Sequence, residues 1–99
     1  MSKKDLVMQN PNTVTVIFEE GFKRGNEVIT EVELTRPKTG ALRGLSLAQL
    51  LQLDVNSLAK LSPRITSPTM NEHDVYELSP ADFTAFGKEV ISFFVTTEV

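Results

Sequence analysis

LSPADFTAFGKEVISFF, residues 78–94, decides the fold because it contains the clearest helix start in the chain. Ser79 is a capping residue type, Pro80 suits the first helical position, and Asp82 places negative charge near the exposed N–H groups. These signals predict a helix from Pro80 to about Val95. At 100° per residue its apolar side chains share about one third of the circumference. They are Phe83, Phe86, Val90, Phe93 and Phe94.

The other end of the sequence predicts a β-hairpin. Apolar and polar side chains alternate in Thr13–Glu20, and the alternation returns in Val28–Arg36. Ile17 breaks the pattern and is expected to be partly covered. Gly21–Glu27 contains two glycines and is expected to turn the chain between the strands. An isolated hairpin is only marginally stable, so its apolar face needs a helical cover.

Helical spacing replaces the alternation in the middle of the chain. Leucines recur there at intervals typical of helices: Leu42, Leu45, Leu50, Leu51, Leu58 and Leu61. Asp54 is predicted to cap a short helix, and Ser62 before Pro63 is predicted to end it. Asn71 is predicted to cap another short helix that runs to about Leu78.

These elements predict an α+β fold, in which an N-terminal antiparallel β-hairpin packs against several short helices and a longer C-terminal amphipathic helix. With 99 residues, one domain is expected. We expect residues 1–12 to form a flexible arm and residues 13–99 a single domain. The hairpin would occupy residues 13–36 and the helical part residues 39–95.

Composition and charge exclude several classes of function. The net charge is −3, and residues 71–99 hold one base against six acids, a net charge of −5. Nucleic-acid binding needs clustered Lys and Arg, so no nucleic acid is expected as a partner. No apolar run approaches the roughly 18 residues of a membrane span. The chain contains no cysteine, which excludes disulfides, thiolate metal sites and thiol catalysis.

The titratable residues give no pattern of a reaction centre. His73 is the only histidine and stands between two acids, but adjacent residues on a helix do not face a common point. Glu31 and Glu33 fall on the solvent face of a predicted strand. Gly21–Gly25 contains two bases and a phenylalanine but lacks the spacing of a phosphate loop. We therefore expect no catalytic residue, no cofactor and no metal.

The phenylalanines of the C-terminal helix have two interpretations. They either cover the hairpin as its core, where burying each Phe stabilises by about 1.5–3 kcal/mol, or they leave part of their face exposed to a partner. Phe22 at the predicted hairpin tip either packs back onto the strands or marks a contact site. The second interpretation gives these partner-binding candidates: Phe22, Phe83, Phe86, Val90, Phe93 and Phe94.

Three short motifs follow one another along the chain. RPKTGALRGL stands at residues 36–45, LSPRIT at residues 61–66 and LSPADF at residues 78–83, and the helical part then closes on Phe93-Phe94. In the order and spacing of these motifs the chain resembles the tail assembly chaperone family of Mu-like, contractile-tailed phages. The resemblance covers about residues 14–95.

The resemblance implies a non-enzymatic protein that binds the tape measure protein and keeps it soluble during tail morphogenesis, in the host cytoplasm. In such phages the tape measure protein is a long, helix-rich, aggregation-prone chain around which tail tube subunits polymerise. Tail tube subunits and a second copy of this chain are further candidate partners. The alternative function is a structural component of the phage tail or connector that is present in the virion.

Overall fold

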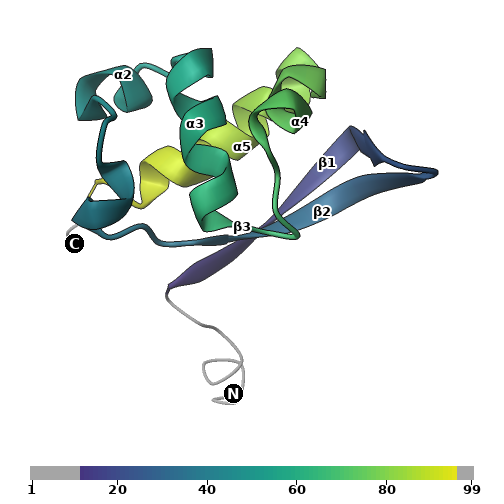
Figure 1. The fold of residues 1–99 in the computed structure, drawn as a ribbon, viewed down its shortest axis with the longest axis horizontal. Helices are drawn as coiled ribbons and strands as arrows, with labels where there is room; N and C mark the ends of the chain where they lie inside the picture. The colour runs from purple at the N-terminus through teal and green to yellow at the C-terminus, as the bar shows by residue number, and fades with distance from the viewer. Residues whose placement is uncertain (1–11, 96–99) are drawn as a thin grey trace.

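A computed structural model describes residues 12–95 of the chain. This part of the chain begins with a β-hairpin, and short helices follow (Figure 1). The α+β prediction is confirmed, whereas the predicted arm lies, apart from Asn12, outside the described residues. The elements are β1 (Thr13–Arg24), β2 (Glu27–Thr35), a 3₁₀ turn η1 (Thr39–Leu42), α2 (Leu47–Leu51), α3 (Val55–Ile65), β3 (Thr66–Ser67), α4 (Glu72–Glu77) and α5 (Pro80–Ser92).

The sheet has the order β1-β2-β3, and both strand pairs are antiparallel. β1 pairs regularly with β2 from Thr13 to Ile17, and again from Phe22 to the turn. Between these ladders, residues 18–21 of β1 stand opposite the single residue Thr30, so they form a bulge. We call residues 18–21 the β1 bulge.

The turn predicted over Gly21–Glu27 is shorter in the structure, because β1 continues to Arg24. Gly21 occupies the bulge at φ +75°, where a Cβ atom would lie 2.1 Å from the carbonyl oxygen of Ile29. Only glycine fits this backbone. Beyond the bulge the side chains of β2 change faces, so Ile29 is half-buried whereas Val28 is exposed. The strand therefore continues past the bulge, and the bulge interrupts the predicted alternation of apolar and polar side chains.

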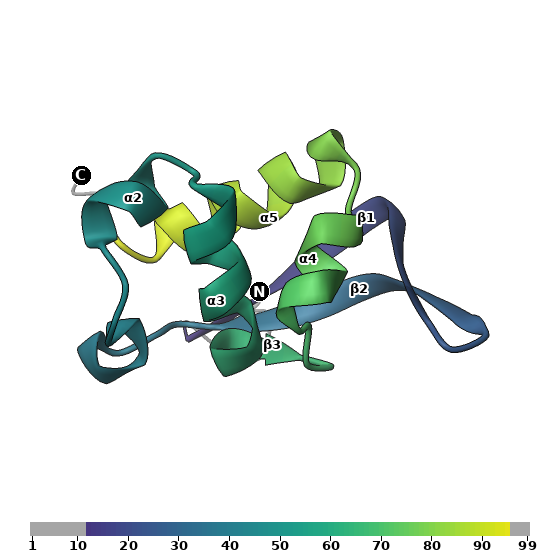
Figure 2. The same cartoon turned by 45° about the horizontal axis from the view of Figure 1, so that its top comes forward.

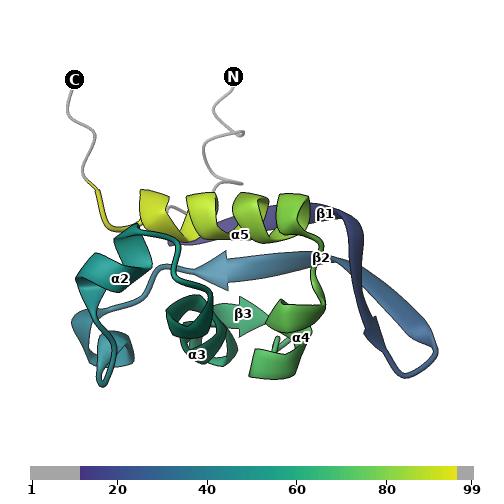
Figure 3. The ribbon, with the colours of Figure 1, turned by 90° about the horizontal axis from the view of Figure 1, so that it is seen from above.

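The helices form a layer on one side of the hairpin (Figures 1 and 2). α5 runs alongside β1, while α3 and α4 pack against each other beside it (Figure 3). One apolar cluster joins both layers. Its buried members are Val16, Phe18, Phe22, Val32, Leu34, Leu50, Leu58, Ala59, Leu61, Ile65, Met70, Val75, Leu78, Phe86, Val90 and Phe93. The predicted covering of Ile17 is wrong, because this side chain is 70% exposed.

The prediction that Ser62-Pro63 ends the third helix is also wrong, because α3 continues through Pro63 to Ile65. Proline has no N–H to donate to the carbonyl of Ala59. The hydroxyl of Ser62 lies 3.1 Å from this carbonyl oxygen and 3.0 Å from that of Met70, and can donate to either. The serine thereby replaces the missing backbone donor inside the buried last turn. α5 ends at Ser92, three residues before the predicted end.

Candidate partner-binding surface

The carboxylate of Asp82 attaches the start of α5 to the β1 bulge. It accepts hydrogen bonds from the backbone N–H groups of Glu19, Glu20 and Gly21, at 2.7, 2.9 and 3.0 Å. Its own N–H donates to the hydroxyl of Ser79, the predicted cap, at 3.1 Å. The predicted helix start is confirmed, but the sequence indicated only an interaction of Asp82 with its own helix.

The environment of Asp82 keeps its carboxyl ionised. The side chain is 2% exposed, and burial alone would raise its pKa. The hydrogen bonds from the bulge and from Ser79 outweigh this effect, so the pKa lies below its ordinary value. The ionised side chain of Asp82 thus fixes the start of α5 relative to the sheet.

The three motifs found in the sequence contact one another or the sheet. Arg64 of the second motif donates to the carbonyl oxygens of Ala41 and Arg43 in the first, at 2.6 and 3.0 Å. Arg36, also in the first motif, donates to the carbonyl oxygen of Phe93 at 3.1 Å, and its guanidinium lies 5.2 Å from the centre of the Phe93 ring. The motif residues therefore hold distant segments together.

The structure divides the six candidate residues between the core and the surface. Four of them belong to the buried cluster: Phe22, Phe86, Val90 and Phe93. Phe22 meets Phe18 edge-to-face with ring centres 6.3 Å apart, and its own ring lies beneath the guanidinium of Arg24. Arg24 is itself held by an ion pair to Asp74. Only Phe83 and Phe94 remain half-buried at the surface.

Phe83 contributes to an apolar groove that the sequence analysis did not identify. The start of α3, the end of α4 and the start of α5 meet there, and the groove has a volume of about 240 Å³. We call it the α3–α4–α5 groove. Its lining residues are Val55, Val75, Tyr76, Leu78, Pro80 and Phe83.

The walls of the groove are open to solvent while its floor belongs to the core. Val55 is 43% exposed and Tyr76 is 52% exposed, whereas Val75 and Leu78 are buried. The hydroxyl of Tyr76 donates to Oδ1 of Asn56 at 2.7 Å, which links α4 to α3. No periodicity signals these exposed positions, because each lies at an end of a short helix and meets the others only after folding.

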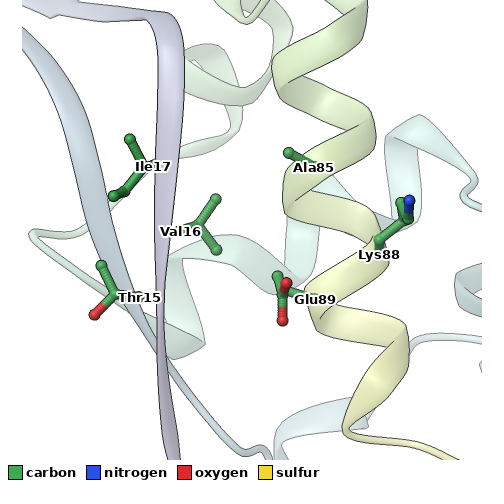
Figure 4. A pocket seen from close by; sticks show the side chains of 6 residues that line it. All are labelled: Thr15, Val16, Ile17, Ala85, Lys88 and Glu89. Carbon is green, nitrogen blue, oxygen red and sulfur yellow. The ribbon is translucent and has the colours of Figure 1, made fainter.

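A second hollow lies between β1 and α5 and has a mixed lining (Figure 4). Val16 points toward α5, and Glu89 lies on the side of α5 nearer the strand, whereas Lys88 lies on the side of the helix farther from the strand. Charged and polar groups make up half of this lining: Thr15, Lys88 and Glu89. The hollow is therefore less suited to an apolar contact than the α3–α4–α5 groove.

The remaining sequence candidates stay at the surface. Nε2 of His73 lies 3.4 Å from a carboxylate oxygen of Glu77, and both side chains are exposed. Among residues 12–95, no group of three or more histidine and acidic side chains is arranged to hold a metal ion. Within the same range, no helix combines the length and the apolar character needed to cross a membrane.

An apolar groove with a buried floor and exposed aromatic and aliphatic walls is typical of a surface that binds protein segments. The fold and the groove thus define a small α+β protein with a candidate protein-contact site. The model of the family described as "Phage tail assembly chaperone proteins, E, or 41 or 14" matches residues 15–95. The chain therefore belongs to this family of tail assembly chaperones.

Two relatives come from Escherichia phage P2. The chain is 38% identical to tail assembly protein E′ over 88 residues, which are 89% of this chain and 61% of E′. It is 37% identical to tail assembly protein E over 86 residues, which are 87% of this chain and 92% of E. The chain thus spans less than two thirds of E′ but nearly all of E. No solved structure matches it significantly.

The assignment confirms the family that the motif order predicted. Because both relatives belong to P2, the assignment is to the family as a whole rather than to its Mu-like members. The family's protein partners act in tail assembly, which agrees with a contact surface as the candidate site.

Proposed function

We propose that this chaperone binds the tape measure protein and keeps it soluble during tail morphogenesis in the host cytoplasm. The observation that carries the proposal is the family match over residues 15–95, together with two relatives named as tail assembly proteins. The motifs that carry the resemblance make structural contacts, so the function rests on a surface rather than on a reaction.

The exposed apolar side chains support this function physically. A chaperone must cover apolar surface on a partner and release it later, which favours several weak contacts over one tight interface. Large apolar side chains that are at least two-fifths exposed are distributed over β1, β2, α2, α3, α4 and the end of the described chain. They are Ile17, Val28, Leu47, Leu51, Val55, Tyr76 and Val95.

Co-expression with the tape measure protein of the same phage tests the proposal. We expect a larger soluble fraction of the tape measure protein when the chaperone is present, and recovery of both proteins in an affinity pull-down. An unrelated acidic domain of similar size serves as the control. If the soluble fraction does not rise and no complex is recovered, the proposed function is wrong.

Analysis of purified particles separates this function from the structural alternative. An assembly chaperone leaves the product, so mass spectrometry of mature virions should find this chain at far below one copy per tail. A stoichiometric amount would contradict the chaperone role and assign the chain to the tail or connector.

A further inference from the structure

We propose that the α3–α4–α5 groove binds an amphipathic helix of the partner whose apolar stripe is flanked by Lys or Arg. The proposal rests on the proposed function and names the surface and the chemistry of the bound segment. It follows from the size, the charge and the fixed shape of the groove.

The size of the groove indicates side chains of a protein as its occupant. Its volume of about 240 Å³ lies below the range of about 300–1,000 Å³ that is usual for small-molecule sites. Its exposed walls are Val55 and Tyr76, on α3 and α4, and the half-buried Phe83 on α5 closes it. A surface of this kind accepts the apolar anchors that a helix presents at positions i, i+3 or i+4, and i+7.

The charge around the groove determines which helix fits. No Lys or Arg stands within four residues of any lining residue, in residues 51–59 or 71–87. Glu72 is exposed there and lies one turn before Tyr76 on the same face of α4. The bases that approach α4 from β1 are matched by acids outside the groove: Arg24 pairs with Asp74, and Lys23 lines a separate hollow with Glu77. A helix with basic flanks meets opposite charge at the rim, whereas an acidic helix is repelled. Charge complementarity therefore selects a basic amphipathic helix.

The groove is formed before any partner binds. The capping box between Asn71 and Asp74 fixes the start of α4, and the Tyr76–Asn56 hydrogen bond joins its end to α3. Asp82 holds the start of α5 on the β1 bulge. Preformed walls lower the conformational entropy lost on binding, so even a small groove contributes to affinity.

A matched pair of substitutions tests the apolar contact. Val55→Glu places a charge on the wall of the groove, and an acid at the first position of α3 favours the helix. Val28→Glu makes the same change at an exposed position of β2, outside the groove. Affinity for the full-length tape measure protein, and for overlapping 30-residue peptides that cover it, is measured by calorimetry. Thermal unfolding confirms that both variants fold.

We expect Val55→Glu to weaken binding about tenfold or more, and Val28→Glu to change it less than about twofold. The peptides that bind should be those with an apolar helical stripe and Lys or Arg beside it. A second pair, Glu72→Gln against Glu31→Gln, tests the rim. Only the first substitution should reduce the loss of affinity that added salt causes, because Glu31 lies on the sheet.

The outcomes separate this proposal from the proposed function. If the wild-type chain and Val55→Glu bind the tape measure protein with equal affinity, the groove proposal is wrong and the proposed function stands. Wild-type chain that does not bind overturns both. Selection of acidic peptides overturns the charge argument. If the wild-type chain self-associates and Val55→Glu is a monomer, the groove binds a second copy of the chain. This outcome also overturns the proposal.

Discussion

A hydrogen bond of 3.0 Å joins the carboxylate of Asp82 to the backbone N–H of Gly21, 61 positions earlier in the chain. The same carboxylate accepts from Glu19 and Glu20, so one side chain satisfies three successive N–H groups of the β1 bulge. The first turn of the last helix and the irregular part of the first strand therefore form a single structural unit.

Asp82→Asn should destabilise the fold by about 2–4 kcal/mol. Asparagine lacks the negative charge, and its NH₂ group would replace one of the two oxygens that accept from the N–H groups of the bulge. Urea unfolding at pH 7 measures the difference. Asp54→Asn is the matched control: Asp54 caps α3 by accepting from Ser57 N–H, and asparagine caps helices about as well as aspartate. Equal losses in the two variants would contradict a special role for Asp82.

The stability of the wild-type chain should fall as the pH is lowered through the range of the carboxyl groups. The pKa of Asp82 is lower in the folded chain than its value of about 3.9 in an unfolded chain. The unfolded state therefore takes up the proton first, and the stabilisation present above about pH 5 is lost as the pH falls through the folded pKa.

Asp82→Asn should make this pH dependence shallower without abolishing it. The pKa of Asp54 is also lowered, by the side-chain and backbone hydrogen bonds of Ser57, and this contribution remains in the variant. Unfolding free energies at pH 7, 5, 4 and 3 test the expectation. Parallel curves for the wild type and the variant would show that Asp82 does not contribute to the acid lability.

Gly21→Ala should destabilise by about 3 kcal/mol or more, because a Cβ at this position would lie 2.1 Å from a backbone oxygen and the φ of +75° is unfavourable for alanine. Gly25→Ala is the control. Its φ is +64°, but nothing lies within 4 Å of the added atom, so about 1 kcal/mol is expected. Similar losses in thermal melts would show that the strain comes from φ alone.

Ser62→Ala should destabilise by about 1–3 kcal/mol, because it leaves buried carbonyl oxygens near Pro63 without the hydroxyl that donates to them. Ser92→Ala removes a comparable hydrogen bond to the carbonyl of Glu89 at an exposed position, and should change stability by less than about 0.5 kcal/mol. Chemical denaturation compares the two. A neutral Ser62→Ala would mean that the proline is tolerated for another reason.

Local signals predicted the starts of α3, α4 and α5. Ser79, Asn71 and Asp54 each cap the helix that the sequence assigned to them, because a capping side chain bonds to an N–H two or three residues away. The alternation of apolar residues likewise placed Val16 and Val32 in the core. Such signals depend only on neighbours in the chain.

The features that were not predicted depend on residues far apart in the sequence. Asp82 binds the amides of the β1 bulge, and the continuation of α3 through Pro63 uses a hydroxyl that also reaches Met70. The α3–α4–α5 groove exists only where three helix ends meet, so no single segment carries a signal for Val55 or Tyr76. Most of the partner-binding candidates that were chosen from the apolar face of α5 therefore lie in the core: Phe86, Val90 and Phe93.

The contact between Asp82 and the β1 bulge has a consequence for the behaviour of the chain at high concentration. β1 lies at an edge of the described sheet, and a free edge is a template on which strands of other molecules can assemble. A carboxylate occupies three consecutive amides of that edge, and the bulge interrupts its regular spacing. The bulge and its bound carboxylate therefore block the pairing of a strand from another molecule along this part of the edge.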